Sequence, residues 1–192
     1  SFIFILKKKP VLWKMSLYYS CINLFLNSLI LIGIPVLITQ HLRFSSNVAN
    51  RLYGYAQGII AVGSVLGALL AGILSKKLKP KSIPFFIICA SLSVFLEGGA
   101  LQTLENPMLI YFILIISCCI QLILVTLFTV QIITYLQILT PKNLMGKVIS
   151  CVICICMCTN PIGQFIYGIF FGSVGISIHI IFYITAIIMI VI

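Results

Sequence analysis

The stretch that decides the class of this chain runs from Pro107 to Leu139 and reads PMLIYFILIISCCIQLILVTLFTVQIITYLQIL. It contains no Asp, Glu, Lys or Arg, and it is longer than the roughly 20 apolar residues that a helix needs to cross the hydrocarbon of a bilayer. Over the whole chain, 62% of the residues are hydrophobic, 7% are charged and the mean hydropathy is +1.27. A soluble domain of 192 residues could not bury so much apolar surface. The composition therefore predicts an integral membrane protein.

Apolar stretches on both sides of this segment complete the expected architecture. Windowed hydropathy predicts an all-α membrane protein with six transmembrane helices. The six spans are residues 11–40, 52–78, 83–101, 107–139, 143–171 and 176–192, and residues 1–10 are interpreted as the end of a cytoplasmic linker. Because the chain begins with Ser and ends inside an apolar run, we expect it to be a fragment of a longer protein.

The charged residues alternate between the two sides of these spans. The lysines form three clusters, and both arginines and both acids lie in the alternate gaps, in the order Lys7, Lys8, Lys9 and Lys14, then Arg43 and Arg51, then Lys76, Lys77, Lys79 and Lys81, then Glu97 and Glu105, then Lys142 and Lys147. The positive-inside rule places the lysine side in the cytoplasm. We therefore predict a multi-pass membrane protein with both ends cytoplasmic.

The net charge of +10 does not indicate nucleic-acid binding. The lysines lie at the ends of hydrophobic spans, where they contact anionic head groups of the lipid bilayer. Glu97 and Glu105 are interpreted as solvated charges at the outer edge of the third and fourth spans. On this interpretation the chain supplies no membrane-embedded carboxylate, and any proton-coupling acid would lie elsewhere in the protein.

Polar residues form a stripe on the first span. Ser16, Ser20, Asn23 and Asn27 recur at helical spacing within an arc of about 60°. Asparagine is costly against lipid, so the stripe is expected to face other helices or water. It predicts either the wall of a substrate cavity or interhelical hydrogen bonding. The candidate cavity residues are Ser20, Asn23, Asn27, Gln121, Gln131 and Gln164, with Tyr19 and Phe25 near the stripe.

Small residues on the second span predict close helix packing. Gly63 and Gly67 form a G-x-x-x-G pair, which lets two helix backbones approach each other in lipid. Pro35 and Pro161 fall inside spans and predict bends, either beside a pathway or as plain structural kinks. The candidate packing and gating residues are Gly63, Gly67, Gly72, Pro161 and Gly163.

The eight cysteines do not indicate a metal site. Cys151, Cys154, Cys156 and Cys158 lie in an apolar span, and their spacing does not place four thiolates on one helical face. His179, alone in the sixth span, is either a proton relay or a neutral hydrogen-bonded residue. No nucleotide-binding or hydrolase motif is present, so we predict no enzyme activity, no cofactor and no metal.

Two stretches resemble the Major Facilitator Superfamily of transporters. Gly72-Ile-Leu-Ser-Lys-Lys-Leu-Lys-Pro-Lys81, after a glycine-rich helix that Tyr53-Gly54 opens, resembles the superfamily's signature loop, with Lys76 in the place of its acid and Lys79 in that of its second glycine. The stretch Thr134-Tyr-Leu-Gln137-Ile-Leu-Thr-Pro141, followed by Gly146-Lys147-Val-Ile-Ser150, Pro161-Ile-Gly163 and Gly168, resembles the macrolide-efflux-like branch, with Lys147 in the place of an arginine.

The resemblance implies the C-terminal six-helix half of a twelve-helix drug:proton antiporter, built from two inverted three-helix repeats. The expected partners are an N-terminal six-helix half of the same permease and a small lipophilic substrate. Lys77, Lys81 and Lys147 are the implied basic residues of the cytoplasmic loops.

Three alternatives stay open at this point. The chain could belong to a permease for another solute, such as a siderophore. It could be an intramembrane thiol-redox enzyme that uses the cysteine run, or a membrane scaffold that transports nothing.

Overall fold

The computed structural model describes residues 10–42, 44–74, 82–172 and 177–191, and this part of the chain is helical, with no strand. The first helix is continuous and comprises α2 (Pro10–Ile22), η1 (Asn23–Asn27), α3 (Ser28–Val36) and η2 (Leu37–His41). The other helices are α4 (Ser46–Leu74), α5 (Ile83–Thr103), α6 (Pro107–Leu139), the short η4 (Lys142–Leu144), α7 (Met145–Gly172) and α8 (Ile178–Val191). The all-α fold class is confirmed.

The helices match the lengths that a membrane requires. Five of them are long and apolar enough to cross a bilayer, and the sixth, α8, is apolar but has 14 residues. The second helix begins at Ser46 rather than at residue 52, because its first turns are polar and a hydropathy window excludes them. The predicted linker and the loop with Lys77 and Lys81 lie outside the described residues, apart from Pro10, which begins α2.

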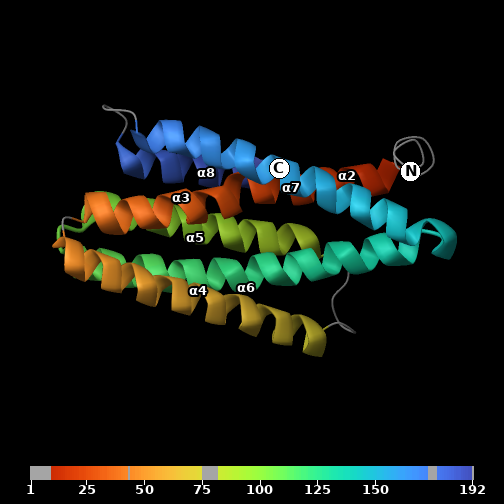
Figure 1. Cartoon of the computed structure of the whole chain (residues 1–192), viewed down its shortest axis with the longest axis horizontal. Helices are drawn as coiled ribbons and strands as arrows, with labels where there is room; N and C mark the ends of the chain where they lie inside the picture. The colour runs from red at the N-terminus through yellow and green to blue at the C-terminus, as the bar shows by residue number, and fades with distance from the viewer. Residues whose placement is uncertain (1–9, 43, 75–81, 173–176, 192) are drawn as a thin grey trace.

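The packing of the helices follows an internal symmetry. Helix α4 packs along α6, α7 packs along the first helix, and α5 packs on α8. Exchanging the first three spans for the last three converts the α4–α6 pair into the pair of α7 with the first helix, and it leaves the α5–α8 pair unchanged. This is the pairing expected for two inverted three-helix repeats. Figure 1 shows α4 and α7 at opposite flanks of the bundle, with the first helix and α6 between them.

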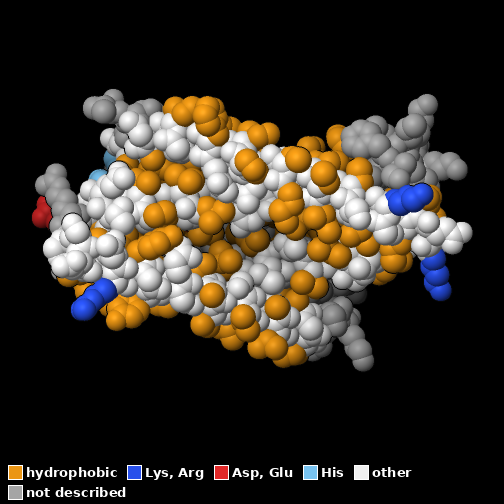
Figure 2. Space-filling view, viewed as in Figure 1, with side chains coloured by type: hydrophobic (Ala, Val, Ile, Leu, Met, Phe, Trp, Pro, Cys, Tyr) orange, Lys and Arg blue, Asp and Glu red, His pale blue; other side chains and the backbone are white. Residues whose placement is uncertain are grey.

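The described charged side chains on the surface lie at the two ends of the bundle (Figure 2). Lys14, Lys142 and Lys147 belong to the end where α2 begins and where α6 turns into α7, and Arg51 and Glu105 belong to the opposite end. Apolar side chains cover the surface between the ends. Such an apolar band between two polar ends is the surface that a bilayer requires.

Two π-helical segments interrupt the first helix. In η1, Asn23 Nδ2 donates to the carbonyl oxygen of Tyr19 at 2.9 Å, and Ser28 Oγ lies 3.2 Å from the carbonyl oxygen of Asn23. Side chains thus bond carbonyl groups that the wider turn leaves accessible. The second segment, η2, follows Pro35, which has no N–H to donate to the helical ladder.

Glycines bring α4 and α6 into backbone contact. A Cβ atom added at Gly63 would lie 2.9 Å from the carbonyl oxygen of Cys119, and one at Gly67 would lie 2.8 Å from Cβ of Thr126. Only a residue without a side chain fits either position.

Candidate functional site

The predicted polar stripe forms a chain of hydrogen bonds on η1. Asn27 Nδ2 donates to Oδ1 of Asn23 at 2.8 Å, and both side chains are half-buried. Tyr19 and Phe25 on the same helix are also half-buried. The two amides are held in place by η1, yet each keeps part of its surface accessible, which is the arrangement that a ligand-binding wall requires.

Helix α7 adds two more half-buried amides next to this stripe. Ser28 Oγ lies 3.1 Å from both the carbonyl oxygen and Oδ1 of Asn160, and Gln164 Nε2 donates to Asn160 Oδ1 at 3.5 Å. A Cβ added at Gly163 would overlap the carbonyl oxygen of Leu24 and the side chain of Ser28. Gly163 therefore permits the close contact that joins the two sets of amides. We name Asn23, Asn27, Asn160 and Gln164 the amide wall.

The remaining cavity candidates lie elsewhere. Ser20 is 6% exposed, and its Oγ is 3.4 Å from Sγ of Cys156 on α7. Gln131 on α6 is 5% exposed. Gln121 is fully buried, and its side chain faces α5 rather than the amide wall. The structure thus brings Asn23, Asn27 and Gln164 together through Asn160, which we did not single out as a cavity residue.

The prediction that Glu97 is a solvated loop charge is wrong. Its side chain is 1% exposed and lies within α5, at 2.7 Å from the donor Nε2 of Gln121 and 3.5 Å from the donor Sγ of Cys118. Glu97 follows Ala90 and Val94 on the buried face of α5, at spacings of seven and three residues. This apolar periodicity is the sequence signal that could have identified it. The chain therefore contains a membrane-embedded carboxyl group.

The candidate gating residues divide into packed and open positions. Gly63, Gly67 and Gly163 are in backbone contacts, whereas a Cβ at Gly72 would meet no described atom within 4 Å. Pro161 is exposed inside α7.

Of the predicted basic loop residues, the structure describes Lys147, which is exposed in the first turn of α7.

The cysteines of α7 point to different sides of the helix. Cys156 is buried, Cys151 is half-buried, and Cys154 and Cys158 are exposed. The described residues contain no group of three or more His, Cys, Asp or Glu side chains that could hold a metal ion.

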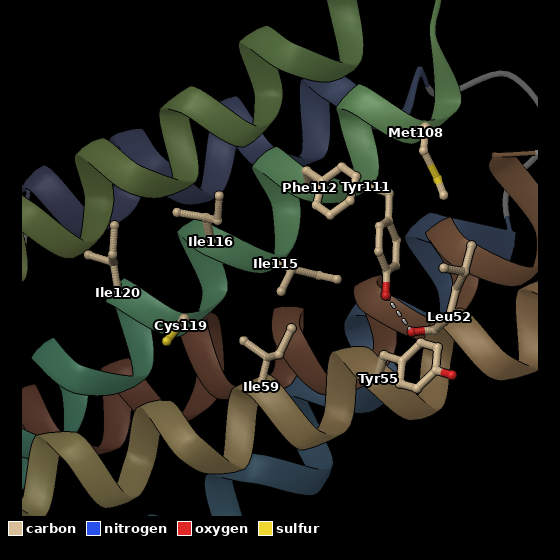
Figure 3. Close-up of a pocket in the computed structure, with 10 residues that line it drawn as sticks. All are labelled: Leu52, Tyr55, Ile59, Met108, Tyr111, Phe112, Ile115, Ile116, Cys119 and Ile120. Carbon is tan, nitrogen blue, oxygen red and sulfur yellow. Dashed lines mark hydrogen bonds between the residues drawn. The ribbon is translucent and has the colours of Figure 1, made fainter.

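An apolar groove of about 400 Å³ lies between α4 and α6 (Figure 3). Tyr111 crosses it and donates its hydroxyl to the carbonyl oxygen of Leu52 at 2.7 Å. None of the candidate cavity residues lines this groove, whose walls also include Tyr55, Ile59 and Phe112. We therefore interpret it as part of the lipid-facing surface.

Comparison with known proteins identifies the family. The family model described as Major Facilitator Superfamily matches residues 2–158, most of the chain. No curated protein and no solved structure matches the chain. Members of the superfamily are membrane transporters rather than enzymes, so the thiol-enzyme hypothesis is set aside. With its six apolar helices, paired as two inverted repeats, the chain belongs to the Major Facilitator Superfamily of membrane transporters.

Proposed function

We propose that this chain is the C-terminal half of an efflux permease of a bacterial plasma membrane, which exports small lipophilic compounds, such as macrolides, in exchange for protons. Transport proceeds by alternating access, with the substrate bound between two six-helix halves. The observation that carries the proposal is the amide wall, because half-buried amides inside a membrane-spanning bundle need a polar or aqueous neighbour.

The flanks of the bundle support a second half as partner. On α4, a Cβ at Gly54, Gly58 or Gly72 would meet no described atom within 4 Å, and the same holds for Gly146 and Gly168 on α7. Small residues on an exposed face permit the close approach of another helix in lipid. Helix α7 carries Asn160 and Gln164 of the amide wall, and α4 lies at the opposite flank of the bundle (Figure 1), so a second half packed along both helices would cover the wall.

The chemistry of the wall supports a weakly polar substrate. The wall offers amide donors and acceptors, and the half-buried rings of Tyr19 and Phe25 lie on the same helix. None of the four wall residues is charged. A site with a few amides among apolar side chains binds mostly by apolar contact and uses the polar groups for orientation.

Replacing Asn27 by Leu in the full-length permease tests the proposal. This change removes an amide from the wall and keeps a similar volume. We expect efflux of a lipophilic dye from energised cells to fall roughly tenfold, the equivalent of one hydrogen bond to the substrate. Asn50→Leu, the same substitution at an exposed position on α4, is the matched control and keeps efflux.

Two results would contradict the proposal. One is equal efflux by the Asn27→Leu and Asn50→Leu variants at equal expression. The other is dye efflux that continues unchanged when a protonophore collapses the proton gradient, since the proposed exchange has no other energy source.

A further inference from the structure

Glu97 is a carboxyl group enclosed by α5, α6 and α8. Its side chain is 1% exposed, and it accepts hydrogen bonds from Nε2 of Gln121 and Sγ of Cys118. The next residue of α5, Gly98, packs closely against α8, because a Cβ atom added at Gly98 would lie 3.0 Å from the ring of Tyr183. Helix packing on both sides thus excludes lipid and bulk water from the carboxyl group.

The hydrogen-bond network around Glu97 lacks one donor for a buried acceptor. Gln121 is fully buried, and its Oε1 atom has no hydrogen-bond partner among the described residues. A hydrogen on the Glu97 carboxyl would supply the missing donor, since a carboxylic acid and a carboxamide can form two parallel hydrogen bonds. Exchanging the oxygen and nitrogen of the amide does not remove the shortage, because two oxygens would then face each other across 2.7 Å.

No described cation lies near Glu97 to neutralise it. Lys14, Arg51, Lys142 and Lys147 are all exposed and lie at the ends of the bundle. On α6 the titratable group that faces Glu97 is Cys118. On α8, Tyr183 donates its hydroxyl to Gln102 Oε1 at 2.9 Å, and the ring of His179 lies 6.3 Å from the Tyr183 ring. A buried carboxylate with such neighbours loses its hydration without gaining an ion pair.

We propose that Glu97 binds and releases the proton that drives transport, and that Gln121 positions its carboxyl group in both states. This inference rests on the proposed proton exchange. The proton comes from water on one side of the membrane, adds to a carboxylate oxygen of Glu97, and leaves to water on the other side. The Gln121 amide donates to the carboxylate and, after protonation, also accepts from the acid.

Helix α6 provides the physical link to the substrate. On α6, the side chain of Gln121 contacts Glu97 of α5. Further along the same helix, Thr129 lies next to Tyr19 of the first helix, and Gln131 follows two residues later. A change in hydrogen bonding at Glu97 therefore acts on a helix that also contacts the element bearing the amide wall.

A chemical label tests the proton site without transport. A hydrophobic carbodiimide adds to the acid form of a carboxyl group, and the adduct rearranges to a stable N-acylurea with no other reactant. We expect mass spectrometry of the full-length protein in detergent to find this adduct on Glu97, with labelling that declines as the pH is raised. Glu105, exposed in the loop before α6, is the control carboxyl group. Absence of the adduct on Glu97 at every pH would overturn the inference.

The positioning role of Gln121 has its own readout in this experiment. Gln121→Leu removes both the donor and the acceptor, and we expect the pH of half-maximal labelling at Glu97 to move. An unchanged labelling profile in a folded Gln121→Leu protein would show that Gln121 only fills space.

Transport by the full-length permease in proteoliposomes separates this inference from the proposed function. In Glu97→Gln we expect loss of the dye accumulation driven by a pH gradient, with retention of dye exchange without a gradient. Glu105→Gln keeps both activities. If the unmodified protein accumulates no dye on a pH gradient, the proposed function fails. If it does and Glu97→Gln matches it, or if a sodium gradient replaces the pH gradient, the assignment of the proton to Glu97 is wrong.

Discussion

Replacing Gly163 by Ala tests the contact between η1 and α7, which brings Asn23 and Asn27 of the amide wall next to Asn160 and Gln164. One methyl group at this position overlaps the backbone carbonyl of Leu24 and the side chain of Ser28. The carbonyl belongs to η1 and cannot rotate away as a flexible side chain would. Helix α7 must therefore move away from the first helix, or the protein must unfold locally.

The structure sets the size of the effect. Overpacking against a backbone that cannot relax costs about 3 kcal/mol, the upper part of the usual range. Separating the helices also breaks the contact of Ser28 Oγ with Asn160, which is 3.1 Å long and contributes about 1 kcal/mol. We expect Gly163→Ala to lower the free energy of unfolding by about 4 kcal/mol.

The matched control lies on the same helix. A Cβ at Gly168 would meet no described atom within 4 Å, so Gly168→Ala is expected to leave stability unchanged or raise it by up to about 1 kcal/mol. The assay is unfolding of the detergent-solubilised protein with a denaturing detergent, followed by tyrosine and tryptophan fluorescence. Equal stability of the two variants would refute the contact geometry on which the amide wall depends.

Three further outcomes follow from the packing. Gly67→Ala should lower the free energy of unfolding by about 2 kcal/mol, because α4 and α6 touch there, whereas Gly58→Ala, at an open position of the same helix, should not lower it. Tyr111→Phe should cost about 1 kcal/mol in the same assay, since it removes one hydrogen bond to the backbone of α4. Replacing the exposed Cys154 and Cys158 by Ala should leave dye efflux unchanged, and loss of efflux at equal expression would show that these thiols are required for transport.

The number and order of the spans could be predicted from the sequence because a bilayer imposes a minimum length on each apolar helix. The charge-free stretch from Pro107 to Leu139 became α6 with the same bounds. The G-x-x-x-G pair indicated close packing, and the structure places both glycines against the backbone of α6. Such features depend on one helix and on the properties of lipid, so a single sequence contains them.

The predictions that failed concern features that depend on side-chain contacts. The hydropathy analysis placed Glu97 at the membrane edge, because a window average does not detect a single carboxyl group that is hydrogen-bonded to Gln121 of another helix. The same contact turned Gln121 away from the predicted cavity. The π-helical turn at Asn23 also escaped prediction, since it depends on side chains that bond individual carbonyl groups.

The accessibility of single cysteines tests the account most directly. In the full-length permease without its native cysteines, Asn27→Cys and Gln164→Cys should react with a water-soluble thiol reagent, and a transported lipophilic compound should slow the reaction. Leu96→Cys and Ile187→Cys, exposed on α5 and α8, should stay unlabelled because lipid covers them. Labelling of the second pair with protection of the first from water would contradict a transport pathway along the amide wall.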